Sequence, residues 1–158
     1  ESAYDDLGAR VVEALPADGL AVLNASVPLV AALAARTPAR VLRFGRGGDV
    51  TAERVELNSE LHPRFELRSP WGSRSVELGV RGLHNVDNAL AAVTVALALD
   101  VALDDAVTAL ADAATSPWRM ELSVAESGAR ILNDAYNASP ASMDAAIRAA
   151  VLRPIMSK

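Results

Sequence analysis

The stretch "LAVLNASVPLVAALAARTPARVLRFG", residues 20–45, decides the fold class of this chain. A short apolar run suits a buried strand over 19–25, a helical pattern follows over 28–36, and a second strand fits 39–45. An amphipathic helix that ends before Pro16 comes first. Helix, strand, helix, strand at this spacing is typical of a parallel sheet with crossovers. The sequence therefore predicts an α/β fold with a mostly parallel sheet flanked by helices.

The pattern changes after this stretch. Apolar residues alternate with charged ones at period two over three segments, as in half-exposed antiparallel strands, and we expect a small antiparallel side sheet. Helical and strand patterns then alternate to the end, with Asp104 as one N-cap and Ser139 as another. The side strands are expected at 51–58, 63–69 and 73–80, the helices at 84–99, 104–114 and 140–148, and two further strands at 120–126 and 129–135.

Composition limits the classes of function. The chain has 158 residues, of which 51% are apolar, enough for about one domain with a sizeable core. A net charge of −5 disfavours a nucleic-acid partner, and the absence of cysteine excludes disulfides and thiol nucleophiles. The longest apolar stretch, residues 89–99, is too short to cross a bilayer. We expect a cytoplasmic protein with no membrane partner.

The single lysine, Lys158, is the last residue, and the other 14 basic residues are arginines. A phosphate-binding loop of the form G-x-x-x-x-G-K-[ST] needs a lysine beside its glycines. The glycine-rich segment 45–49 has none, so it is predicted to be a turn rather than a phosphate cradle.

The segment "RGLHNVDNALAAV", residues 81–93, places two asparagines in the first turn of an alanine-rich helix. One interpretation makes Asn85 or Asn88 a helix cap. The other is that these carboxamides, which carry a donor and an acceptor, read the edge of a flat heterocycle such as adenine. His84 is expected to be structural, because no further histidine or carboxylate lies at metal-ligand spacing. No metal site is predicted.

Two later segments carry polar side chains next to predicted strands. Arg119 either points at a phosphate or forms a local ion pair with Glu121. Asp134 follows a strand, where a carboxylate often binds a ribose diol, and Tyr136 and Asn137 lie in the same loop. The alternative for this loop is an Asx-rich turn without a ligand.

The order of these motifs resembles one family. "GLHNVDNALAA" (82–92), "RME" (119–121) and "NDAYNASPASMDAAI" (133–147) are similar to the central domain of the Mur ligases. The similarity extends to "EALPADGLAVLNAS" (13–26) and "VLRFG" (41–45). It is strongest to the branch that adds D-alanyl-D-alanine to UDP-N-acetylmuramoyl-tripeptide in peptidoglycan synthesis.

The resemblance implies a reaction in which ATP phosphorylates the substrate carboxylate and an amine attacks the acyl phosphate. It implies Mg²⁺ as a further cofactor, with ligands mostly outside this chain, and UDP-N-acetylmuramoyl-peptide and D-alanyl-D-alanine as partners of the full enzyme. It also implies cofactor-binding roles and no catalytic residue in the chain. Asn85 and Asn88 would lie at the adenine with His84 in support, Arg119 at the phosphates, and Asp134 at the ribose with Tyr136 and Asn137 nearby.

Departures from the family pattern set further expectations. Residues 1–150 would be a partial central domain that lacks the upstream phosphate loop, and 151–158 a linker or a cut end. Ser26-Val27 stands where the branch usually has an acidic pair. We therefore expect the isolated chain to be inactive as an enzyme, and to self-associate or be marginally stable. The alternative function is a catalytically inactive nucleotide-binding or interaction module derived from a Mur ligase.

Overall fold

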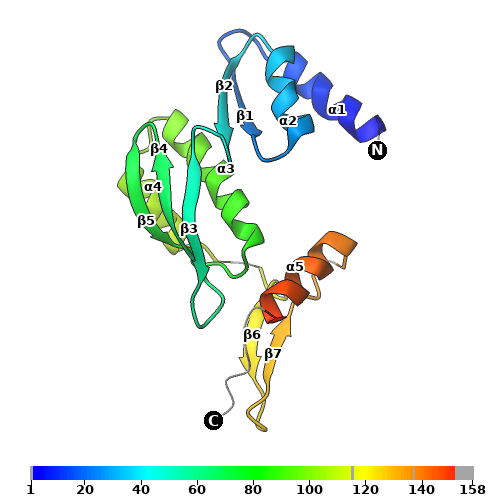
Figure 1. Ribbon diagram of the computed structural model, residues 1–158, viewed down its shortest axis with the longest axis vertical. Helices are drawn as coiled ribbons and strands as arrows, with labels where there is room; N and C mark the ends of the chain where they lie inside the picture. The colour runs from blue at the N-terminus through cyan, green and yellow to red at the C-terminus, as the bar shows by residue number, and fades with distance from the viewer. Residues whose placement is uncertain (1, 115, 137, 152–158) are drawn as a thin grey trace.

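The computed structural model describes residues 2–114, 116–136 and 138–151, and its elements form three groups along the chain (Figure 1). The first group contains α1 (Ser2–Glu13), β1 (Leu20–Asn24), α2 (Pro28–Ala32), the 3₁₀ helix η1 (Leu33–Arg36) and β2 (Arg40–Phe44). The second contains β3 (Thr51–Leu57), β4 (Pro63–Ser69), β5 (Gly72–Glu77), α3 (His84–Ala98) and α4 (Leu103–Ala111). The third contains β6 (Glu121–Val124), β7 (Arg130–Asn133) and α5 (Pro140–Val151).

The first group is a parallel strand pair with a helical crossover. β1 and β2 pair in register from Leu20 opposite Arg40 to Asn24 opposite Phe44, as the strand-helix-strand pattern predicts. The helix expected over 28–36 is confirmed, but its second half tightens into 3₁₀ geometry. The following glycine segment forms a turn, in which the Arg43 backbone N–H donates to Asp49 Oδ2 over 2.8 Å. Since the Gly45 and Gly48 amides also donate to backbone carbonyls, these two amides are not directed at a ligand.

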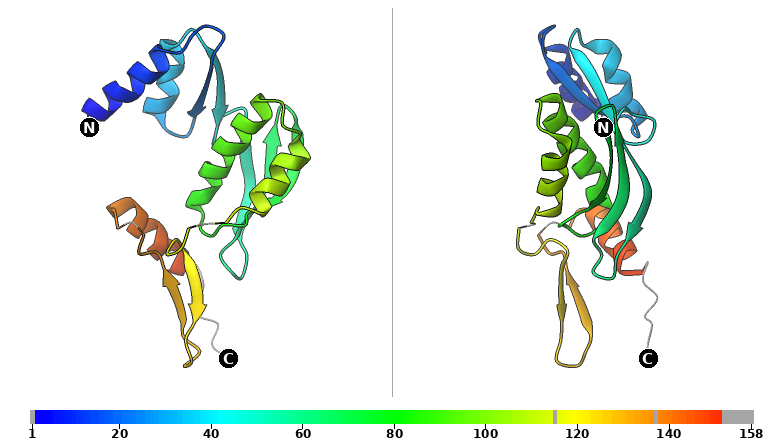
Figure 2. Two further views of the ribbon diagram at one scale, coloured as in Figure 1. Left: turned by 180° about the vertical axis from the view of Figure 1, so that it is seen from behind. Right: turned by 90° about the vertical axis from the view of Figure 1, so that its left-hand side faces the viewer.

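The second group is a three-stranded antiparallel sheet covered on one face by two helices (Figure 2). The strand order β3-β4-β5 confirms the predicted side sheet. Alternate residues of the sheet and one face of α3 form the main core, since every fourth or third residue of a helix lies on the same side. The largest fully buried side chains here include Leu67, Val76, Leu78, Leu90, Val93 and Leu97.

The start of α4 differs from the prediction. The N-cap residue is Ala102, one position before the first helical residue Leu103, so Asp104 lies inside the first turn. Its carboxylate instead accepts hydrogen bonds from the Arg74 guanidinium of β5, with 2.5 Å between Arg74 Nε and Asp104 Oδ1. A carboxylate in a first turn also interacts favourably with the helix dipole, so Asp104 stabilises α4 without capping it.

The third group is an antiparallel hairpin followed by a helix. β6 and β7 pair from Glu121 opposite Asn133 to Val124 opposite Arg130, around a tight turn in which Gly128 has a φ of +82°. Ser139 caps α5 as predicted, because its Oγ accepts a hydrogen bond from the Ser142 backbone N–H at 3.2 Å.

The α/β class is confirmed, but the parallel part is smaller than the sequence pattern suggested. Within the described residues, β1 and β2 are the one parallel pair of named strands. β6 and β7 pair with each other because a short turn joins them, and they do not extend a parallel sheet. None of the helices in the described ranges is long and apolar enough to span a bilayer. Residues 152–158 of the predicted linker lie outside the described ranges.

Candidate functional site

The first turn of α3 holds both predicted asparagines, and neither is the helix cap. The N-cap residue is Leu83, which makes no side-chain cap, so the capping interpretation of Asn85 and Asn88 is wrong. Asn85 is half-buried, and its Nδ2 donates to the Arg81 carbonyl over 2.7 Å. Asn88 is exposed, and its Nδ2 donates to Asn85 Oδ1 over 3.0 Å. The two carboxamides thus form a chain of hydrogen bonds along one face of the helix.

This face retains polar capacity for a ligand. Within the part of the chain that the structure describes, Asn88 Oδ1 accepts no hydrogen bond, and Asn88 Nδ2 uses one of its two hydrogens. Ala92, four residues on, is exposed on the same face, whereas Ala89 packs in the core at 6% exposure. The small side chain of Ala92 therefore leaves room beside Asn88 on this face.

Gly82, two residues before α3, connects this face to the third group of elements. Gly82 has a φ of +91°, and a Cβ at this position would lie 3.2 Å from Met120 Cε and 2.6 Å from His84 Cε1. The Met120 side chain, which is 2% exposed, therefore packs directly beneath the chain that enters α3. Figure 1 shows the start of α3 and the base of the β6–β7 hairpin at the same end of the middle sheet.

The loop after β7 brings the other predicted residues together. Asp134 is half-buried, and its Oδ1 accepts a hydrogen bond from the Met120 backbone N–H over 3.0 Å. Tyr136 is fixed by its backbone, whose N–H donates to the Trp118 carbonyl over 3.2 Å. The Arg119 guanidinium lies over the Tyr136 ring, with 3.8 Å between Cζ and the ring centroid. Arg119, Asp134 and Tyr136 thus form one polar cluster, and Asn137 lies outside the described residues.

The structure places an aromatic ring against Arg119 and a backbone amide against Glu121. Arg119 stacks on Tyr136, a cation–π contact that holds the planar guanidinium in one orientation. The nearby carboxylate of Glu121 accepts a hydrogen bond from the Trp118 backbone N–H, with 3.4 Å to Oε2. Glu121 therefore has a backbone partner, and the ring of Tyr136 is the platform that orients Arg119.

Neither histidine marks a metal centre. In the described ranges, no group of three or more acidic or histidine side chains is arranged to hold a metal ion. His84 is exposed, and its Nε2 lies 3.3 Å from Asn85 Nδ2. The described residues thus offer no three-ligand cluster for Mg²⁺, and no chemical step in this chain is assigned to that ion.

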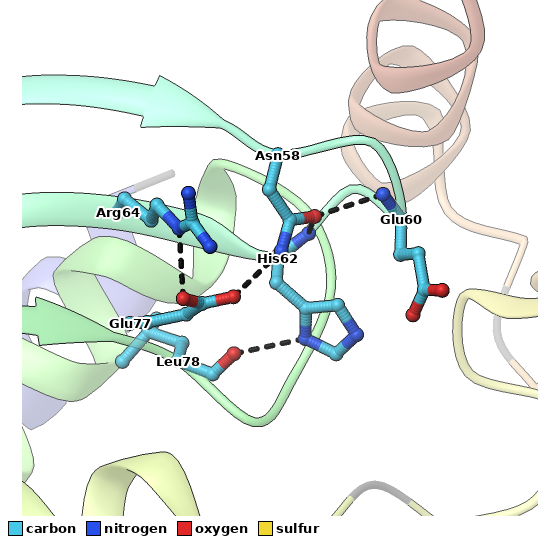
Figure 3. A network of polar contacts seen from close by, with 6 residues as sticks. All are labelled: Asn58, Glu60, His62, Arg64, Glu77 and Leu78. Atoms are coloured by element: carbon cyan, nitrogen blue, oxygen red, sulfur yellow. Dashed lines mark hydrogen bonds and ion pairs between the residues drawn. The ribbon is translucent and has the colours of Figure 1, made fainter.

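His62 and its neighbours form a network that sequence reasoning missed (Figure 3). His62 is half-buried, and its Nδ1 donates to the Leu78 carbonyl over 2.8 Å. Asn58 Nδ2 donates to Glu77 Oε1 over 2.6 Å, and Arg64 Nε donates to Glu77 Oε2 over 2.7 Å. The hydrogen bond from Arg64 is the main reason that the pKa of Glu77 lies below its ordinary value. An asparagine at the end of a predicted strand was the available signal for this turn.

The comparisons with known proteins concern the family of this chain. A family model described as the Mur ligase middle domain matches residues 2–96. The chain belongs to the Mur ligase family. This membership confirms the resemblance carried by the motifs at 82–92, 119–121 and 133–147.

The similar relatives are Mur ligases of more than one kind. The UDP-N-acetylmuramoyl-tripeptide–D-alanyl-D-alanine ligase of Mycobacterium tuberculosis is 42% identical over 144 residues, which are 89% of this chain and 28% of that protein. The UDP-N-acetylmuramate–L-alanine ligase of Stenotrophomonas maltophilia is 42% identical over 150 residues, or 90% of this chain and 31% of that protein. The chain thus spans less than a third of the length of these relatives.

Solved structures give the same picture for the fold. A crystal structure of MurF from Acinetobacter baumannii matches with a TM-score of 0.83 and 33% identity, over 92% of this chain and 32% of that one. MurF from Thermotoga maritima in complex with ADP matches with a TM-score of 0.75 and 25% identity, over 91% of this chain and 33% of that one.

Proposed function

We propose that this chain is the adenosine-binding part of an ATP-dependent Mur ligase that adds D-alanyl-D-alanine to UDP-N-acetylmuramoyl-tripeptide in the cytoplasm. The observation that carries this proposal is the shared location of two polar groups, the asparagine face of α3 and the cluster around Asp134. They are joined through Gly82 and Met120. The ADP complex of the similar Thermotoga maritima MurF supports a nucleotide as the ligand.

Each part of the site suits one part of a nucleotide. Asn88 retains an acceptor and a donor hydrogen for the edge of adenine, with Asn85 and His84 behind it. The Met120 N–H holds Asp134 Oδ1, which leaves Oδ2 for the ribose hydroxyls. Arg119, oriented by Tyr136, is placed to neutralise phosphate charge, and we assign Asn137 to the same loop.

ATP, when bound, supplies the phosphoryl group that activates the substrate carboxylate as an acyl phosphate. In this assignment the residues of this chain hold and orient the nucleoside, and Arg119 is the one group assigned to phosphoryl transfer. That transfer depends on positioned cations, and the sequence has no lysine before Lys158. The isolated chain is therefore expected neither to hydrolyse ATP nor to form a peptide bond.

The test is a titration of ADP into the purified ¹⁵N-labelled chain, followed by NMR because binding is expected to be weak. Amides around Asn88 and Asp134 should shift, and Asn88→Ala or Asp134→Ala should each weaken binding by about tenfold, the effect of losing one or two good hydrogen bonds. Arg68→Ala, which removes an arginine on the middle sheet that pairs with Glu53, is the matched control. An ADP affinity that neither substitution changes would overturn the proposal.

The second candidate is a catalytically inactive binding module derived from such a ligase. Ser26, which stands in place of an acidic residue of the branch, favours it, because Ser26 Oγ accepts a hydrogen bond from the Arg46 backbone N–H over 2.8 Å. The Ser26 side chain thus closes a loop by holding the Arg46 backbone amide. A G-x-x-x-x-G-K-[ST] segment encoded upstream in the same reading frame would decide for the ligase, and a natural start near Glu1 would decide for the module.

A further inference from the structure

The turn between β3 and β4, residues 58–62, is a rigid element built around one side chain (Figure 3). Asn58 Oδ1 accepts hydrogen bonds from the backbone N–H groups of Glu60 and His62, over 2.8 and 3.0 Å. The Leu61 N–H donates to the Asn58 carbonyl over 3.1 Å. The Asn58 side chain is itself fixed by Glu77 of β5. The turn is therefore anchored to the middle sheet at its base.

Successive carbonyls of this turn point at the two halves of the proposed nucleotide site. The Ser59 carbonyl accepts from Arg130 NH2 of β7 over 3.1 Å, and the Glu60 carbonyl accepts from Arg81 Nε over 2.9 Å. The Leu61 carbonyl accepts from the Gly82 N–H over 2.9 Å. Leu61 is 4% exposed and has a φ of +69°, a left-handed backbone conformation within this turn. One turn thus contacts both the entry to α3 and the β6–β7 hairpin.

The contacts of Arg81 and Arg130 connect this turn to residues that are proposed to bind the nucleotide. The carbonyl of Arg81 accepts the hydrogen bond from Asn85 Nδ2, and Asn85 in turn holds Asn88. Arg130 begins β7, the strand that ends next to Asp134. A ligand that binds both groups needs their spacing fixed beforehand, because mobility would be lost on binding at a cost in affinity. The guanidinium groups supply charge-assisted hydrogen bonds, which are stronger than neutral ones.

Resting on the proposed function, we propose that the β3–β4 turn sets the spacing of the nucleoside site, with Arg81 positioning the base-facing asparagines and Arg130 positioning the ribose-facing Asp134. These two arginines touch no part of the nucleotide in this assignment. They act through the turn and are positioning residues.

The test compares nucleotides that differ at one place. For the purified chain and the variants Arg130→Ala and Arg81→Ala, the dissociation constants of ADP, 2′,3′-dideoxy-ADP and GDP are measured by NMR titration. Arg130→Ala should weaken ADP binding by about three- to tenfold, less than the loss of a direct charge-assisted hydrogen bond, because Arg130 acts on the nucleotide only through Asp134. It should also reduce the preference for ADP over the dideoxy analogue. Arg81→Ala should instead reduce the preference for ADP over GDP.

Three controls separate positioning from general destabilisation. Arg130→Lys, which keeps a charged donor, should restore most of the lost preference, and Arg68→Ala should leave all three constants unchanged. In an Asp134→Ala background, Arg130→Ala should have no further effect, because the group that it positions is gone. Equal weakening of all nucleotides by Arg130→Ala would overturn the inference while the proposed function stands. Unchanged ADP binding in Asn88→Ala and Asp134→Ala would overturn the proposed function itself.

Discussion

Glu77 is the residue on which the turn network depends. Its two carboxylate oxygens accept hydrogen bonds from Asn58 and Arg64, and both partners stabilise the charged form. The Arg64 hydrogen bond is the largest cause of the lowered pKa of Glu77. A carboxylate with a lowered pKa in the folded protein contributes stability above its pKa in the unfolded chain, and this contribution is lost as the pH falls through the folded value.

The first prediction concerns this pH dependence. Between pH 7 and about pH 3, a range that includes the glutamate pKa of about 4.3 in unfolded chains, Glu77→Gln should lose less thermal stability than the wild type. The measurement is the melting temperature at a series of pH values. Glu126→Gln, at an exposed hairpin position with no ion pair among the described residues, should keep the wild-type slope. An identical slope for Glu77→Gln would show that the network does not stabilise the charged form.

The second prediction concerns Gly82, the contact point between α3 and Met120. Gly82→Ala should destabilise the chain by about 2 kcal/mol, because the residue has a positive φ and the new methyl group would meet His84 and Met120. Gly47→Ala is the matched control, since Gly47 also has a positive φ but nothing lies within 4 Å of its added Cβ. Gly47→Ala should lower the free energy of unfolding by about 1 kcal/mol, because only the backbone conformation is strained at this position. Urea unfolding midpoints measure both, and equal losses would mean that Gly82 is not closely packed.

At the scale of elements, local patterns predict some features and miss others. The strand-helix-strand pattern of 20–45, the three side strands and the Ser139 cap were predictable because each depends on neighbours in sequence. Two features were not predictable. One is that β6 pairs with β7 alone, and the other is the role of Asn58 in its turn. They depend on which strand edges and side chains meet in space, and the contact between Arg130 and Ser59 joins residues 71 positions apart.

The same distinction applies to the candidate site. The residue types at 85, 88, 119 and 134 were identified from the motif order, and the structure brings Arg119 and Asp134 into one cluster. Their partners were not predictable. Met120, which connects the two halves, and Arg81, which holds Asn85, lie in motifs that the sequence singles out, but neither residue type predicts the contact that it makes.

The third prediction tests the cap of α5. Ser139→Ala removes the hydrogen bond from Ser139 Oγ to the Ser142 N–H and should cost about 1 kcal/mol, the usual value for a lost N-cap. Backbone amides in the first turns of α5 should then exchange with solvent about fivefold faster, measured by hydrogen exchange. Ser139→Asp retains a cap acceptor and should exchange at the wild-type rate. Faster exchange throughout α3 as well would contradict an effect confined to this helix.

For the whole molecule, the third group exposes large apolar side chains on both its hairpin and its helix. Val124 is 68% exposed and Ile131 is 50% exposed on the hairpin. Along α5, Met143, Ile147 and Val151 follow at four-residue spacing with 45%, 57% and 73% exposure, which places them on one face. Such a contiguous apolar face is typical of a surface that another protein segment covers.

The fourth prediction follows from this exposed face. The isolated chain should self-associate with rising concentration, and Ile147→Glu should shift it toward monomer because a carboxylate is costly to bury in an apolar contact. Sedimentation equilibrium measures both. Arg54→Glu, a charge change on the exposed surface of the middle sheet, is the control and should associate like the wild type. Because apolar association weakens on cooling and changes little with moderate salt, whereas charge pairing is screened by salt, the two causes are distinguishable. Association that disappears at 0.5 M salt, a concentration well into the screening range with a Debye length of about 4 Å, would assign the contact to charges and not to the face of α5.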